Sequence, residues 1–95
     1  MLHILLTSPF KMDFNLMLQM LSPQDDFVAL QDGVLIAMEK NILIKKLIEI
    51  PVNLFLLKED IIVRGISEFV LKSFKLINYS EFIKLTQLQS KFMNW

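Results

Sequence analysis

The chain has 95 residues, a formal net charge of +0, a hydrophobic fraction of 54% and a mean hydropathy of +0.48. This length suits one small domain, residues 1–95, and a neutral chain lacks the basic field on which free-standing nucleic-acid binders depend. The sequence has no cysteine and one histidine, which excludes disulfides, a thiolate nucleophile and a two-histidine metal site within the chain.

No targeting or membrane segment is expected. The apolar start, Met1 to Leu6, is shorter than the roughly 7 to 15 apolar residues of a secretory signal. No apolar run approaches the roughly 18 residues of a membrane span. We therefore expect a cytoplasmic protein with no membrane contact, no direct nucleic-acid contact and no cofactor.

The first elements are a buried strand at Leu2–Leu6 and, after Ser8 and Pro9, a helix. Two apolar stripes at helical spacing predict that helix. One stripe comprises Phe10, Phe14, Met17, Leu18 and Leu21, and the other comprises Met12, Leu16 and Met20. Two apolar faces require two packing partners, so the second stripe is either enclosed in the monomer or a subunit interface.

A second buried strand, Phe27–Leu30, stops at the polar turn Gln31–Gly33. In open α/β folds this carboxyl edge of the sheet is where ligands bind, so Asp32 is a candidate base, phosphoacceptor or metal ligand. The first strand ends in Thr7, Ser8 and Pro9, which does not supply the acidic cluster of a phosphoacceptor site. We expect Asp32 to be the N-cap of the following helix.

The second half of the chain continues the alternation, with strands at Val52–Leu57 and Phe74–Ile77. Gly65 is expected to end a helix that opens at Lys58, because glycine adopts the left-handed conformation without penalty. Asn78, with Glu81 three residues later, predicts a capping box at the last helix. Its buried face is expected to comprise Tyr79, Phe82 and Ile83.

Strands that alternate with helices in continuous apolar runs indicate an α/β fold, with a mostly parallel sheet of four to five strands and helices on both faces. His3 is expected to be structural. Trp95 is hard to explain by the core alone, so we expect it to dock on the domain or on a neighbour. With Met12, Leu16 and Met20 it completes a set of candidate interface residues; no catalytic or metal residue is expected.

Several segments in the same order and spacing resemble the TusB family, also called DsrH-like. They are Met1–His3, Ser8–Pro9, Leu30–Val34 (LQDGV), Leu57–Gly65 (LKEDIIVRG), Asn78–Leu85 (NYSEFIKL) and Trp95. The resemblance covers the chain from end to end. Asn78 stands where the family often has Asp, and Val63 replaces a small residue before Arg64 and Gly65.

The resemblance implies a DsrE-like three-layer fold and a subunit of a bacterial sulfur-relay complex. In that complex TusB-like chains assemble with TusC-like and TusD-like subunits as a dimer of heterotrimers. Sulfur arrives from TusA as a persulfide on a cysteine of the TusD-like subunit, and passes through TusE toward 2-thiolation of tRNA wobble uridine. A chain without cysteine would be a non-catalytic subunit of this complex.

Two other functions are open at this point. The chain could be an α/β enzyme that binds a small ligand or nucleotide and uses Asp32 near Ser8 and Gln31. It could also be an orphan homo-oligomer that associates through Met12, Leu16 and Met20.

Overall fold

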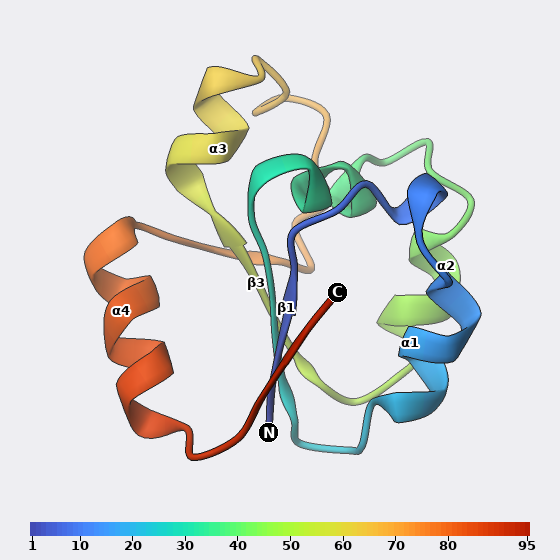
Figure 1. The fold of residues 1–95 in the computed structure, drawn as a ribbon. Helices are drawn as coiled ribbons and strands as arrows, with labels where there is room; N and C mark the ends of the chain where they lie inside the picture. The colour runs from blue at the N-terminus through green and yellow to red at the C-terminus, as the bar shows by residue number, and fades with distance from the viewer.

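A computed structural model describes residues 1–95 as a five-stranded sheet in which every strand pair is parallel. The strand order is β4-β3-β2-β1-β5, and the strands run in one direction through the centre of the molecule (Figure 1). Their bounds are Leu2–Leu5 for β1, Asp26–Ala29 for β2, Asn53–Leu57 for β3, Lys75–Ile77 for β4 and Phe92–Asn94 for β5.

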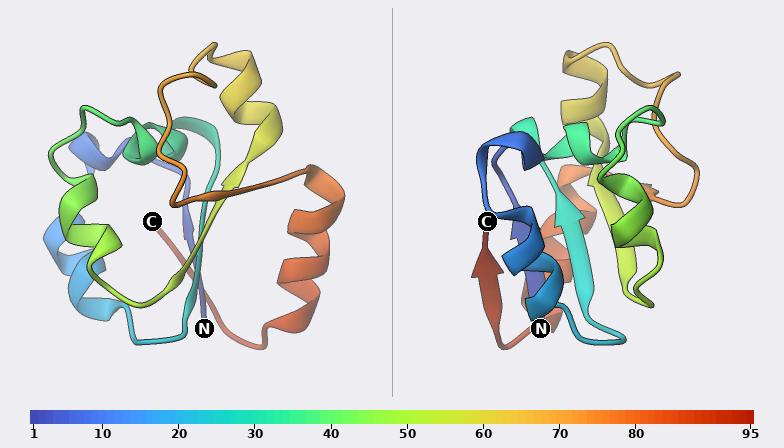
Figure 2. Two further views of the ribbon diagram at one scale, coloured as in Figure 1. Left: turned by 180° about the vertical axis from the view of Figure 1, so that it is seen from behind. Right: turned by 90° about the vertical axis from the view of Figure 1, so that its right-hand side faces the viewer.

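Six helical segments connect these strands. Two are 3-10 helices, η1 at Pro9–Lys11 and η2 at Gln31–Ala37; the α-helices are α1 at Phe14–Met20, α2 at Ile44–Ile48, α3 at Lys58–Val63 and α4 at Tyr79–Leu88. Figure 1 shows α1 and α2 on one face of the sheet, α4 alone on the other, and α3 beyond the carboxyl end of β3; the views in Figure 2 agree. The prediction of an α/β fold with helices on both faces is confirmed.

The two faces of the sheet are covered unequally. The larger core cluster lies under α1, α2 and η2 and comprises Leu5, Phe14, Met17, Leu21, Phe27, Ala29, Val34, Ile36, Ala37, Ile44, Leu47, Leu56, Ile61 and Phe74. The smaller cluster comprises Leu2, Val28, Leu30, Leu57 and Ile77, with Phe82 and Leu85 of α4 packed against it. Burial of apolar surface is the main stabilising term, so the first face contributes most to stability.

The helix expected from Phe10 onward begins later than predicted. Phe10 lies in η1 with 66% of its surface exposed, and Met12 has extended backbone angles that interrupt the helix. Asp13 then caps α1, because its Oδ1 accepts a hydrogen bond from the Leu16 N–H at 3.0 Å. An N-cap side chain satisfies a donor that the first turn leaves free, and this local bond sets the start of α1.

The predicted buried face of the last helix is wrong in part. No residue of α4 is fully buried, and Tyr79 and Ile83 are 58% and 38% exposed. Only Phe82, among the three predicted residues, packs against the smaller cluster. A single helix on this face leaves the flanks of α4 open to solvent.

The C-terminal strand β5 was not predicted from the sequence. It pairs with β1 from Leu2↔Phe92 to Ile4↔Asn94 and forms one edge of the sheet. Three residues are too few to show a periodic pattern.

Candidate interaction site

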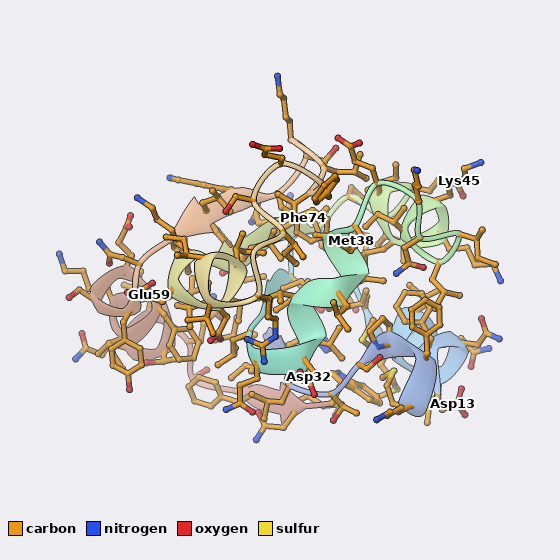
Figure 3. The ribbon with its side chains drawn as sticks, turned by 90° about the horizontal axis from the view of Figure 1, so that it is seen from above. Asp13, Asp32, Met38, Lys45, Glu59 and Phe74 are labelled. Carbon is orange, nitrogen blue, oxygen red and sulfur yellow. The ribbon has the colours of Figure 1, made fainter.

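The turn after β2 is fixed by residues from α3. Gln31 has a positive φ of 52°, and its N–H donates to Asp60 Oδ2 at 2.6 Å. Arg64 donates from Nη2 to Asp32 Oδ1 at 3.0 Å, and its Nη1 lies 3.6 Å from Asp60 Oδ1. These bonds join the carboxyl end of β2 to α3, and Figure 3 looks down on this end of the sheet, with Asp32 on η2 and Glu59 on α3.

The expectation that Asp32 is an N-cap is wrong. The 3-10 helix η2 begins at Gln31, Leu30 is in the N-cap position, and no side chain caps it. Asp32 is therefore inside the first turn. The turn is instead stabilised by Asp60, which is 29 residues further along the chain, so the Asp32 carboxylate is free to pair with Arg64.

The ion pair between Asp32 and Arg64 at this carboxyl edge is an ordinary surface pair. The Asp32 side chain is 65% exposed, and exposed pairs of this kind stabilise a protein by at most about 1 kcal/mol. The nearby Ser8 Oγ accepts a hydrogen bond from the Phe10 N–H. The chain has no group of three or more acidic or histidine side chains arranged to hold a metal ion. The hydrogen bonds to Asp60 and Arg64 orient the backbone of the turn and hold α3 beside η2.

Gly33 is required where η2 passes over the end of β1. A Cβ atom at this position would overlap the backbone carbonyl of Leu5. The Leu5 oxygen already accepts a hydrogen bond from the Leu30 N–H at 3.1 Å. Because backbone atoms cannot rotate away as a side chain can, the close approach of the two segments depends on glycine.

The caps expected at Gly65 and Asn78 are present in the structure. Gly65 has a φ of 65°, and its N–H donates to Ile62 O while the Ile66 N–H donates to Ile61 O. These two bonds form a Schellman motif. Asn78 and Glu81 form a reciprocal capping box at 2.8 and 3.0 Å.

The two ends of the chain meet at His3. This side chain is fully buried; its Nε2 lies 3.0 Å from Asp25 Oδ2, and its Nδ1 accepts a hydrogen bond from Trp95 Nε1 at 3.2 Å. The Trp95 backbone N–H donates to Ile4 O at 2.8 Å. Trp95 also packs against the larger core cluster, so it docks on its own domain.

Asp25 anchors the other side of this network. Burial would raise the pKa of Asp25, but hydrogen bonds from the Ser22 N–H, from His3 and from the N-terminal ammonium of Met1, together with the charge of that ammonium, lower the pKa below its ordinary value of 3.8. Hydrogen bonds to the ionised form favour it. Asp25 is therefore a carboxylate at neutral pH.

The second apolar stripe expected for the first helix divides between core and surface. Met12 is partly buried against the larger cluster, whereas Leu16 and Met20 are 46% and 44% exposed. They lie four residues apart and so share one side of the helix. No residue of α1 is charged, and depletion of charge with enrichment of methionine is typical of the centre of protein interfaces.

Further exposed apolar residues were missed by the sequence reasoning. Ile62 and Val63 on α3 are 57% and 80% exposed, and Leu88 on α4 is 82% exposed. Only Val63 gave a sequence signal of an unusual surface residue, because it is larger than the residue that the family resemblance leads one to expect before Arg64. Ile62 and Leu88 belong to helical patterns of apolar residues that fit a buried face equally well.

The sequence comparisons give the family directly. Residues 7–92 match the family model described as DsrH like protein. The chain belongs to the DsrH-like TusB family. Among the family's members, Protein TusB of Buchnera aphidicola subsp. Acyrthosiphon pisum (strain 5A) is 50% identical over 95 residues, and Protein TusB of Escherichia coli (strain K12) is 37% identical over 95 residues. Each alignment covers 100% of both chains.

Solved structures share the fold of this chain. Protein Tm0979 from Thermotoga maritima is 31% identical with a TM-score of 0.67, covering 98% of this chain and 99% of its own. The ychN protein from E. coli has a TM-score of 0.77 at 17% identity, covering 99% of this chain and 97% of its own. At that identity the ychN likeness shows a shared fold alone, which is the DsrE-like fold expected from the family resemblance. None of the helices of this chain has the length and apolar character needed to cross a bilayer.

Proposed function

We propose that the chain is a non-catalytic subunit of a cytoplasmic TusBCD-type sulfur-relay complex. Its partners would be TusC-like and TusD-like subunits in a dimer of heterotrimers. The complex would pass persulfide sulfur from TusA, through TusE, toward 2-thiolation of tRNA wobble uridine. The observation that carries this proposal is full-length membership of the TusB family in a chain without cysteine.

The absence of a thiol assigns the sulfur chemistry to another subunit. A persulfide forms on a cysteine sulfur, and the thiolate is the reactive form. This chain has none, so we place the reactive cysteine on the TusD-like subunit. The Asp32 carboxylate is engaged by Arg64 at 3.0 Å, which favours a structural role for it over the alternative of an Asp32-dependent enzyme.

Leu16 and Met20 are the residues that we propose for subunit contact. They are exposed, lie one turn apart on α1, and belong to a helix that has no charged residue of its own. The other two candidates, Met12 and Trp95, pack against the core of their own chain. The proposed contact is therefore narrower than the four residues expected from the sequence.

Co-expression with the cognate TusC and TusD proteins tests the assembly. We expect the three chains to elute together in size-exclusion chromatography, and deletion of this subunit to lower tRNA 2-thiouridine measured by mass spectrometry. If TusC and TusD associate without this chain and 2-thiouridine is unchanged by its deletion, the proposal is wrong. A stable homo-oligomer in native mass spectrometry that excludes both proteins would instead favour the orphan assembly.

A further inference from the structure

The hydrogen-bond network at His3 connects the first strand to the last residue of the chain. His3 lies on β1 with no exposed surface, 22 residues from Asp25 and 92 from Trp95. The strand that immediately precedes Trp95, β5, is held to β1 by three residue pairs. The indole adds a side-chain hydrogen bond to this backbone pairing, beside the bonds that the Leu2 N–H donates to Lys91 O and the Trp95 N–H donates to Ile4 O.

The indole determines the protonation state of His3. An indole N–H can only donate a hydrogen bond, so Nδ1 of His3 accepts with its lone pair. The ring proton is then on Nε2, from which it is donated to Asp25 Oδ2 at 3.0 Å. The His3 and Trp95 rings are 15° from parallel with centroids 6.5 Å apart. The neutral imidazole is the form that satisfies both partners.

A second proton on the imidazole would affect the two partners in opposite ways. The Nδ1–H would face the indole N–H, leaving two donors without an acceptor, which is unfavourable in a buried site. On the other side, the imidazolium would form a full ion pair with the Asp25 carboxylate. Because the pKa of Asp25 is lowered, that carboxylate remains charged on mild acidification and retains the imidazolium within the fold.

The surroundings of His3 contain few other charges. The N-terminal ammonium of Met1 lies 3.3 Å from Asp25 Oδ1 and shares this carboxylate. The strand neighbours of His3 are Phe27 and Met93, which carry no charge, and α1 has no charged residue. The carboxylate of Asp26, the residue next to Asp25, bonds elsewhere: it accepts hydrogen bonds from the side chains of Asn53 and Gln89.

We propose that His3 is a proton-operated latch on the C-terminal strand. The neutral imidazole helps to hold Trp95 and β5 on the sheet, and the imidazolium makes both open more often while β1 to β4 remain folded. Because β5 is the outermost strand beside β1, its release uncovers the edge of β1. An uncovered edge presents unpaired backbone groups to which another strand can bind.

Nuclear magnetic resonance of the isotope-labelled full-length chain tests this latch. Spectra of the imidazole nitrogens at about pH 7.5 and about pH 5.5 bracket the range in which histidines generally titrate. Hydrogen exchange then compares the Trp95 amide, bonded to Ile4 O, with the Val28 amide in the central strand β2. We expect the protection factor of the Trp95 amide to fall about tenfold more than that of Val28, the factor associated with one lost hydrogen bond.

Trp95→Phe is the matched variant, because phenylalanine keeps an aromatic ring but has no N–H donor. We expect its β5 amides to be weakly protected at both pH values, with the pH response lost. Three outcomes would each overturn the latch. His3 could keep the neutral Nε2–H form throughout, the β5 and β2 amides could lose protection together, or Trp95→Phe could respond to pH as strongly as the native chain.

Discussion

Replacing Gly33 by alanine would place a methyl group against the backbone carbonyl of Leu5. Overpacking of an interior generally costs about 1 to 3 kcal/mol. The upper end applies here, because the obstructing atom belongs to backbone that also bonds the Leu30 N–H. We therefore expect Gly33→Ala to lower the free energy of unfolding by about 3 kcal/mol, a large part of the stability of a small domain.

The other glycine of the chain is a matched control. Gly65 has a φ of 65°, and a Cβ there would meet no atom within 4 Å, so its substitution is limited by conformation and not by space. A left-handed alanine costs about 1 to 2 kcal/mol, partly offset by the lower entropy of the unfolded chain. We expect Gly65→Ala to cost about 1 kcal/mol, and Gly65→Asn less, because asparagine tolerates the left-handed region.

Urea unfolding followed by far-ultraviolet circular dichroism measures these free energies. Gly33→Asn should be at least as destabilising as Gly33→Ala, because any side chain begins with the same Cβ. The steric argument is refuted if Gly33→Ala costs no more than Gly65→Ala, or if asparagine restores stability at position 33 as it should at position 65.

Three further predictions concern a cap, a pH dependence and a surface. Asn78→Ala removes the cap of α4 and should lower stability by about 1 kcal/mol in the same urea assay; an unchanged midpoint would contradict it. The pKa of Asp25 is lower in the folded state than its ordinary value of 3.8, so its contribution to stability is complete above about pH 4 and is lost as the pH falls through the lower folded value. Acid titration of Asp25→Asn should therefore show a weaker loss of stability below about pH 4 than the native chain, and equal losses would exclude this role. The double variant Leu16→Lys, Met20→Lys should change the free energy of unfolding by no more than about 0.5 kcal/mol but weaken co-purification with TusC and TusD. The control Ile42→Lys, at a 77% exposed site elsewhere, should leave co-purification unchanged. If both variants weaken co-purification equally, α1 is not the contact.

Local signals in the sequence determined much of the fold. Four of the five strands were predicted from apolar runs, because a strand of a parallel sheet that is covered on both faces needs apolar residues throughout its length. The caps at Gly65 and Asn78 were predictable for a similar reason: each depends on atoms within about one helical turn. The absence of cysteine and the family resemblance likewise required no structure.

Only the tertiary structure decided the contacts between distant segments. Asp32 had the sequence pattern of an N-cap, but its role depends on Arg64, which is 32 residues away. The exposed sides of α1 and α4 could not be assigned because helical spacing shows that a face is apolar and does not show whether anything covers it. Trp95 is held by His3, 92 residues earlier, and this contact exists only because β5 returns beside β1.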